Sequence, residues 1–218
     1  MTTRFDHLVI AAQSLDEGQK YIQDTLGVET PLGGKHVAMG THNRIMQLSA
    51  ETYLEIIAIE PEAPQPDHPR WFGLDQAWMR EKLNRSPQLV HWVANVADLE
   101  QTLSKTRLHY GIPTLLRRDH LAWKITLPAD GGIPLAGVLP SLIEWQIDVH
   151  PASGMADLNC SLIELNLHHM HPQWLQQSIE EIGAGSIVNI KATDAQSAPY
   201  IEARIACPKG EVSLVSNL

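Results

Sequence analysis

Residues 4–11 read RFDHLVIA, a run rich in strand-forming side chains, and residues 15–26, LDEGQKYIQDTL, follow with apolar residues at helical spacing. Ser14 or Asp16 can cap this helix at its start, and Gly27 can end it. After a glycine-rich turn at residues 33–34, we expect three extended stretches, at 36–40, 43–48 and 52–59. The predicted order is strand, helix and three strands.

The same order recurs twice along the chain. A second copy begins with QLVHWVAN at residues 88–95, and a third begins with SLIELNL at residues 161–167. A repeated order of elements is the sign of a modular fold. We therefore divide the chain into a first βαβββ module at 1–60, a connector at 61–87, a second module at 88–150, and a third, degenerate module at 158–218. The connector is rich in proline, and Trp71–Leu83 is expected to form a helix.

Composition excludes several classes of protein. A chain of 218 residues with 44% hydrophobic and 19% charged residues is typical of a globular protein. The formal charge of −9, with no long basic run, argues against a nucleic-acid partner. No apolar run is long enough to span a membrane, the N-terminus has no secretion signal, and Cys160 and Cys207 have no paired spacing. We expect a cytoplasmic protein with reduced thiols and a small-molecule partner.

Superposing the first two copies places histidine and glutamate at equivalent positions. His7 and His91 lie in the first strands, and Glu55 and Glu144 lie in the last strands. Strand alternation puts His7 on the face of Phe5 and Val9, which should be buried. A buried carboxylate is unfavourable unless it is paired or binds a cation. The pattern therefore predicts one divalent metal ion, Zn, Ni, Mn, Fe or Co, bound by these two histidines and two glutamates.

The residues resemble those of a known superfamily. The paired units, the stretch GKHVAMGTHN at residues 34–43 and the sequence YLE at 53–55 resemble the vicinal oxygen chelate superfamily, and within it the glyoxalase-like domain group. That superfamily includes glyoxalase I, extradiol dioxygenases and antibiotic-resistance binding proteins. The resemblance implies an α+β fold in which two modules curl into an incomplete β-barrel, with the metal in a central cup. It also implies that Glu144 or Glu55 is the catalytic base.

The third copy departs from this pattern. Glu164 occupies the first-strand position, but Leu214 replaces the carboxylate of the last strand, so we expect this copy to be structural. The histidine-rich stretch at residues 168–171 has no accompanying ligands at metal-binding spacing and is expected to be a surface turn. The cup can form within one chain or between the two chains of a homodimer, because some members of the superfamily exchange units on dimerisation.

Other side chains are candidates for the wall of the cup. His42 and Asn43 lie in a glycine-flanked turn at the expected cup mouth, His36 and Arg44 are further candidates, and Trp123 lies on a middle strand. We expect His42, Asn43, Arg44 and Trp123 to contact substrate. Two further tryptophans directly follow predicted ligands, so alternation turns them to the opposite face, into the core. They are Trp92 and Trp145.

Three functions fit these expectations. The first is a metal-dependent isomerase or lyase that stabilises an enediolate of a small oxygen-chelating substrate. The second is an extradiol-type ring-cleaving dioxygenase, with His7, His91 and Glu144 as an iron triad and Glu55 left over. The third is a metal-free protein that binds a small ligand or confers resistance. The identity of the substrate does not follow from the sequence.

Overall fold

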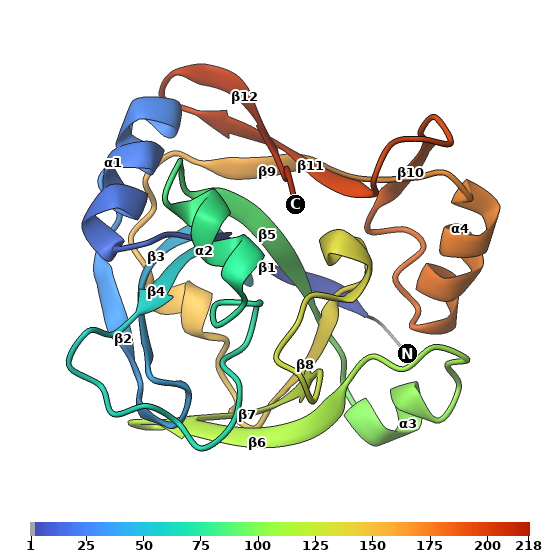
Figure 1. Ribbon diagram of the computed structural model, residues 1–218, viewed down its shortest axis with the longest axis horizontal. Helices are drawn as coiled ribbons and strands as arrows, with labels where there is room; N and C mark the ends of the chain where they lie inside the picture. Colours follow the sequence, from blue (N-terminus) through green and yellow to red (C-terminus); the bar gives the residue numbers. More distant parts are fainter. Residues whose placement is uncertain (1–2) are drawn as a thin grey trace.

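The computed structural model describes residues 3–218, so the first two residues of the first predicted module lie outside it. It has two sheets, an eight-stranded one that is strongly curled and a four-stranded one that packs against its convex side (Figure 1). The predicted α+β class is confirmed. No helix of the described chain is long and apolar enough to cross a membrane.

The elements follow the predicted order. The first repeat contains β1 (Arg4–Ala11), α1 (Leu15–Leu26), β2 (Leu32–His36), the 3-10 turn η1 (Val37–Met39), β3 (Thr41–Ser49) and β4 (Thr52–Ile59). The connector contains α2 (Ala77–Leu83). The second repeat contains β5 (Gln88–Asn95), α3 (Leu99–Leu103), β6 (Ile112–Arg118), β7 (Leu121–Leu127), η2 (Pro134–Gly137) and β8 (Ser141–Trp145), and η3 (Pro151–Gly154) follows it. The third contains β9 (Ser161–His169), α4 (Pro172–Glu181), β10 (Asn189–Ala192), β11 (Tyr200–Cys207) and β12 (Gly210–Val215).

Strand pairing relates the first two repeats to each other. The order in the large sheet is β2-β3-β4-β1-β5-β8-β7-β6. In each repeat the first strand pairs in parallel with the last, β1 with β4 and β5 with β8, and the antiparallel pair β1 and β5 joins the halves. The sheet curls until its outer strands meet, so that Gly34 of β2 lies against the side chain of Arg118 of β6. This is the incomplete barrel expected from the sequence.

The third repeat has the same element order but a different pairing. Here β9 pairs in parallel with β10 and antiparallel with β11, and β12 lies at the edge beyond β11. The four-stranded sheet therefore stands apart from the barrel instead of extending it, in line with the degenerate copy expected from the sequence.

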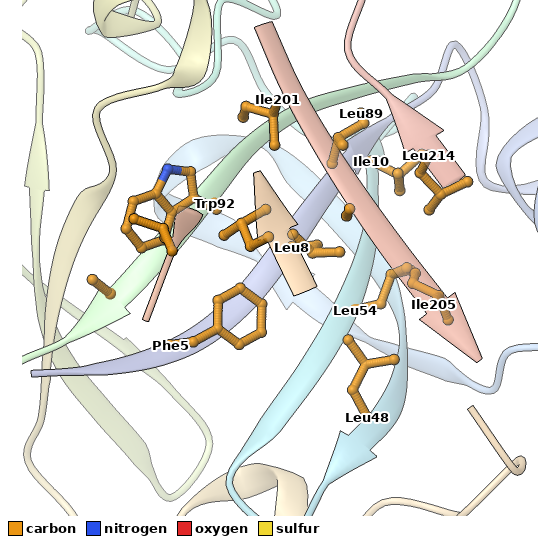
Figure 2. Packing of buried hydrophobic residues seen from close by; sticks show 14 of the residues in the cluster. Phe5, Leu8, Ile10, Leu48, Leu54, Leu89, Trp92, Ile201, Ile205 and Leu214 are labelled. Carbon is orange, nitrogen blue, oxygen red and sulfur yellow. The ribbon is translucent and has the colours of Figure 1, made fainter. Parts of the chain in front are cut away.

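Each face of the large sheet has its own core. On the convex face, Leu8, Leu54 and Trp92 pack with α1 and with the second sheet, whose Ile201 and Leu214 point toward them (Figure 2). The concave face has a second apolar cluster, to which the connector contributes. Its members include Val9, Ile57, Trp71, Phe72, Met79, Val93, Trp123 and Ile143. The expected core position of Trp92 is confirmed.

Helix α1 lies close to the sheet because of a glycine. Ser14 accepts a hydrogen bond from the Glu17 N–H, and Gly27 ends the helix in a left-handed conformation with φ 84°, as predicted. A Cβ atom added at Gly18 would lie 2.3 Å from Cγ2 of Ile56 in β4 and 3.0 Å from Cβ of Ala12.

We therefore expect Gly18→Ala to lower the free energy of unfolding by about 1–3 kcal/mol, because the helix must move away from the sheet. Urea denaturation followed by circular dichroism measures this change. Gly154→Ala is the matched control, since a Cβ atom added there would have no neighbouring atom within 4 Å. Equal stability of the two variants would contradict the prediction.

The connector differs from the sequence expectation. Its helix was predicted over Trp71–Leu83, but α2 begins only at Ala77. The reason is local, because Phe72 and Gly73 have left-handed backbones with φ 56° and 68°, which no helix can include. The N–H of Gly73 donates to the carbonyl of Gly131 at 2.8 Å, which holds this turn against the second repeat. Trp71 and Phe72 are thereby placed over the concave face.

Candidate functional site

A β-bulge in β1 brings the side chains of two adjacent residues together. Phe5 pairs with Ala94 and His7 with Val93, so Asp6 is an extra residue in β1. A bulge re-aims the side chains around it. Asp6 and His7, although adjacent, therefore both reach the concave side, and Phe5 packs in the convex core. The expectation that His7 shares a face with Phe5 was wrong for this reason.

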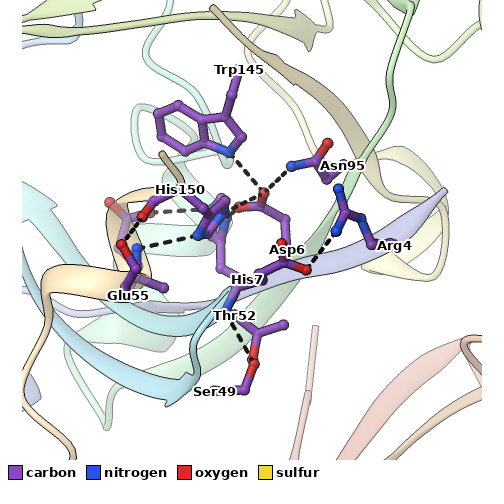
Figure 3. A network of polar contacts seen from close by, with 12 residues as sticks. Arg4, Asp6, His7, Ser49, Thr52, Glu55, Asn95, Trp145 and His150 are labelled. Carbon is purple, nitrogen blue, oxygen red and sulfur yellow. Dashed lines mark hydrogen bonds and ion pairs between the residues drawn. The ribbon is translucent and has the colours of Figure 1, made fainter. Parts of the chain in front are cut away.

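Asp6 is fully buried and accepts four hydrogen bonds (Figure 3). The donors are His7 Nδ1 at 2.6 Å, Trp145 Nε1 at 2.8 Å, Asn95 Nδ2 at 3.1 Å and His150 Nε2 at 3.1 Å. Burial alone would raise the pKa of this carboxyl, but the hydrogen bonds from His150 and His7 outweigh it and hold the pKa well below its ordinary value. Asp6 is therefore an anion.

The Asp6 carboxylate sets the tautomer of His7. Because Nδ1 donates to Asp6, a neutral His7 ring keeps the lone pair of Nε2 free. The ring stacks on Tyr53 of β4, with centroids 4.3 Å apart. His7 Nε2 lies 3.9 Å from Oε2 of Glu55. An acceptor nitrogen and a carboxylate oxygen thus face each other with a gap between them.

Glu55 is fixed by a second set of contacts. Its Oε1 accepts a hydrogen bond from Asn43 Nδ2 at 2.6 Å, and Asn43 Oδ1 in turn accepts from the Gly34 N–H at 2.7 Å. A Cβ atom at Gly33 would lie 2.1 Å from Asn43 Oδ1. These two glycines lie within β2, so the turn expected there was wrong. Their function in the fold is to let Asn43 approach the β2 backbone.

His36 and Arg118 close the opposite side of the site. Arg118 Nη1 donates to His36 Nε2 at 3.1 Å, across the seam between β2 and β6. His36 Nε2 is also 4.0 Å from Oε1 of Glu55. Burial, together with the charge of Arg118, lowers the pKa of His36 to about 3. The imidazole is therefore neutral, and its nitrogen accepts from the guanidinium.

These groups surround a small cavity with a volume of about 40 Å³. A cavity of this size has room for about three water molecules. Tyr53 at the wall keeps its hydroxyl proton, because burial raises its pKa well above the ordinary value. The lining residues are His7, His36, Asn43, Ile45, Tyr53, Glu55, Trp71, Phe72, Arg118, Leu121, Trp123, Ile125, Ile143, Trp145, Pro151 and Met155. The cavity is thus mainly polar on the first repeat, and its other walls are aromatic and aliphatic apart from Arg118.

The structure brings some predicted residues together and separates others. His7, Glu55, Asn43 and Trp123 line the cavity. His42 and Arg44 alternate with Asn43 along β3, so their side chains leave on the other face, where they contact Glu60 and the carbonyl of Thr30. The predicted placement of His42 and Arg44 at the cup was therefore wrong.

Glu144 lies on the convex side of β8. Its Oε2 accepts from the Leu99 N–H at 2.8 Å at the start of α3. The neighbouring residue Trp145 lines the cavity instead, which corrects its expected core position. Strand register explains the error. In the first repeat, Glu55 pairs with Val9, which lies two residues after His7. In the second repeat, the residue two positions after His91 is Val93, and Val93 pairs with Ser141. Ser141, not Glu144, is the counterpart of Glu55.

His91 is buried against Ser141. Its Nε2 lies 2.8 Å from the Ser141 N–H, which donates to it, and Nδ1 has no partner among residues 3–218. Burial, with a smaller contribution from His7, lowers the pKa of His91 to about 3. The Nε2 lone pair is therefore engaged by the backbone, and His91 does not line the cavity.

The predicted metal site does not fit this arrangement. The superfamily that the sequence resembles typically binds a divalent metal, and the sequence pattern predicts His7, Glu55, His91 and Glu144 as its ligands. Glu144 is on the wrong face, and the lone pair of His91 is used by Ser141. At the second imidazole that lines the cavity, His36, the Nε2 atom already accepts a hydrogen bond from the guanidinium of Arg118. No three His, Cys, Asp or Glu side chains of the described chain are grouped to hold a metal ion.

Several residues of the site carry no signal in the sequence. Asp6 reaches the site through a bulge, and Arg118 through contact between the two outer strands of the sheet. Trp71 belongs to the connector, outside both repeats. Repeat register can identify only residues that two copies share, so it could not indicate these three.

Comparisons with known proteins agree with the fold. The glyoxalase-like domain family matches residues 5–183. A crystal structure of a hypothetical protein from Staphylococcus aureus aligns with 99% of this chain and 85% of its own, with a TM-score of 0.61 and 14% identity. A variant of methylmalonyl-CoA epimerase from Streptomyces coelicolor aligns over 69% of this chain and 100% of its own, with a TM-score of 0.43 and 18% identity.

A variant of 4-hydroxymandelate synthase from Streptomyces coelicolor aligns with 98% of this chain and 62% of its own, with a TM-score of 0.48 and 13% identity. No curated protein matches the sequence. At these identities, structural similarity concerns the fold alone.

Proposed function

The chain belongs to the glyoxalase-like domain family of the vicinal oxygen chelate superfamily, and we accordingly propose that it is an enzyme that transfers protons on a small substrate. The reaction class is an isomerisation or lyase reaction at a carbon next to a carbonyl group. The family membership agrees with the resemblance seen in the repeats. The activity itself is our proposal.

The pairing of His7 with Asp6 is the observation that carries this proposal. Asp6 is held as an anion and accepts the Nδ1 proton of His7, which leaves Nε2 as a base at the cavity wall. An anionic carboxylate behind a histidine stabilises the imidazolium that forms when the histidine takes a proton. His7 is thus the base in this proposal, in place of Glu144 or Glu55.

The remaining cavity groups support the same chemistry. Glu55, 3.9 Å from His7 Nε2, can accept or relay a second proton between neighbouring oxygens of a substrate. Tyr53 and Arg118 are donors that can stabilise an oxyanion formed in the reaction. The apolar side chains in the walls lower the local polarity, which strengthens these electrostatic interactions. A metal ion is not needed for any of these roles.

The two other functions predicted from the sequence are weaker. A ring-cleaving dioxygenase needs His7, His91 and Glu144 around one iron, and no observation favours that arrangement. A metal-free binding protein would use the same aromatic cavity without a reaction. Binding without turnover is the result that favours it.

Hydrogen–deuterium exchange tests the proposal. We expect the protein, treated with EDTA, to catalyse exchange of a C–H bond next to the carbonyl in one or more small compounds, followed by NMR in D₂O. A suitable panel is methylglyoxal, dihydroxyacetone, pyruvate, 2-oxobutyrate, L-lactate and L-alanine. His7→Gln should lower the rate at least about 100-fold, since a positioned base contributes about 10²–10⁴-fold.

His68→Gln, at an exposed histidine of the connector, is the control and should exchange at the wild-type rate. Full activity of His7→Gln contradicts the role of His7. Activity that is lost with EDTA and restored by Zn²⁺ or Mn²⁺ contradicts a metal-free reaction.

A further inference from the structure

We propose that the cavity recognises a small carboxylic acid that carries a hydrogen-bond donor on the adjacent carbon, with Arg118 and Trp71 holding the carboxylate. The donor lies between His7 and Glu55. This inference names the substrate class of the proposed enzyme, and it takes the cavity to be the substrate site of that enzyme.

Arg118 is a cation with no carboxylate partner in the described part of the protein. The side chain is half-buried at the end of β6 and lines the cavity. Its single hydrogen bond within residues 3–218 is from Nη1 to His36. A guanidinium has five N–H donors in a planar fork that matches a carboxylate, so most of its capacity is left for a ligand.

The neighbouring Trp71 offers a second free donor. It is 4% exposed and lines the cavity, and its indole Nε1–H has no hydrogen-bond partner in the part of the chain that the structure describes. A buried donor without a partner is unfavourable by about 1–3 kcal/mol, and a ligand oxygen would remove that penalty. The indole N–H is therefore a donor for which a ligand can supply the acceptor.

His36 brings these two donors to the same place. Its ring contacts Trp71 edge to face, with centroids 4.9 Å apart, and its Nε2 accepts from Arg118 at 3.1 Å. Because the imidazole is neutral, it orients the guanidinium without neutralising its charge. The arginine is therefore positioned, and its charge remains for a ligand.

A glycine makes room for the arginine. A Cβ atom at Gly34 would lie 2.9 Å from Cδ and 3.0 Å from Nε of Arg118. A side chain at this position would push the guanidinium away from His36. The close approach of β2 and β6 is thus shaped around the side chain of Arg118.

The other end of the cavity presents acceptors. His7 Nε2 and Glu55 Oε2 are 3.9 Å apart, so a group placed between them lies within hydrogen-bond distance of both. A hydroxyl group there donates its one proton to Glu55 and leaves His7 Nε2 free as the base, whereas an ammonium group can donate to both. A ligand that lacks a donor would leave two buried acceptors facing each other. The site therefore requires both a carboxylate and a donor, within a space of about three water molecules.

Isothermal titration calorimetry with four three-carbon compounds tests both requirements. L-Lactate has a carboxylate and a hydroxyl group, and L-alanine has a carboxylate and an ammonium group. Lactamide lacks the carboxylate, and propionate lacks the donor. We expect lactate or alanine to bind, with lactamide and propionate each at least about tenfold weaker. The stronger of the two acids identifies the donor as hydroxyl or ammonium.

Variants test which residues bind the carboxylate of the ligand. Arg118→Met should weaken binding of the preferred acid at least about tenfold and remove the preference over lactamide, and Trp71→Phe should weaken it several-fold. Arg117→Met is the matched control, because Arg117 is the exposed neighbour on the opposite face of β6, and it should bind like the wild type. Arg118→Lys keeps the charge without the planar fork and carries the test if the methionine variant does not fold.

Three results overturn the proposal. They are equal affinity for lactate and lactamide, wild-type affinity in Arg118→Met, and absence of binding by both acids. The exchange assay separates this inference from the proposed enzyme. Selective binding of an acid without C–H exchange on any compound leaves the carboxylate site standing and refutes the enzyme. Exchange on the panel, together with equal affinity for lactate and lactamide, refutes the carboxylate site and leaves the proposed enzyme standing.

Discussion

Replacing Asp6 with alanine is expected to lower the free energy of unfolding by about 3–5 kcal/mol, the usual penalty for removing one partner of a buried charged network. The fully buried carboxylate accepts from His7, Asn95, Trp145 and His150, and alanine leaves all four donors without an acceptor. A loss of this size is a large share of the stability of an ordinary domain. The cavity should lose its shape together with the stability.

Urea denaturation at neutral pH measures this effect. Asp6→Asn keeps the shape and one acceptor oxygen, so it should lose less stability than the alanine variant while still disturbing the tautomer of His7. Asp67→Ala, at an exposed aspartate of the connector, is the control and should change stability by less than about 0.5 kcal/mol. A loss below about 1 kcal/mol in Asp6→Ala would refute the network as a main source of stability.

The second large effect is destabilisation in mild acid. His36 and His91 are buried, and burial lowers the pKa of each to about 3, against an ordinary value of 6.5. Below pH 6.5 the unfolded chain binds protons at these positions and the folded protein does not, so stability is full above this pH and falls as the pH drops toward 3. For two such groups, the loss at pH 5 relative to pH 8 is about 4 kcal/mol.

The pH range identifies the groups. Three further histidines have pKa values lowered by burial and add to the loss in the same direction. They are His42, His168 and His169. The pKa of Asp6 is lowered below 3.8, so its stabilisation is lost only as the pH falls below that value, outside the range of this measurement. Acid sensitivity between pH 5 and 6.5 therefore comes from histidine.

Urea denaturation curves measured from pH 8 to pH 5 test this prediction. His91→Gln should reduce the loss of unfolding free energy by about 2 kcal/mol, because it removes one of the two buried histidines. His120→Gln, at an exposed site, should not change the loss. A stability that stays constant over this range would show that the buried histidines become protonated in the folded state.

Much of the fold follows from the sequence because two periodicities are visible in it. Alternation in the first strands and helical spacing after them predict the order of elements, and their recurrence predicts the paired repeats. Ser14 and Gly27 bound α1 as their chemistry suggests. These features are local, so a single chain carries enough information to find them.

The site is less predictable because it depends on register. His7 and Glu55 could be found, since both lie on strands of one repeat that pair directly. In the second repeat, sequence similarity indicates Glu144 as the equivalent of Glu55, whereas the strand pairing indicates Ser141. A shift by an odd number of residues moves a side chain to the other face of a strand, and Glu144 lies three positions after Ser141. Only the pairing of β5 with β8 fixes the choice.

The core behind the cavity is completed by residues of the second sheet, which are synthesised after all the residues that line the cavity. Every lining residue precedes residue 156, so all of the site has been translated before β9 begins. The convex core behind the site nevertheless includes Ile201, Ile205 and Leu214, which are translated after every residue of the site. Until they arrive, the back of the curled sheet stays open to water. The back of the sheet that carries the cavity is therefore covered only when a sheet that contributes no lining residue is in place.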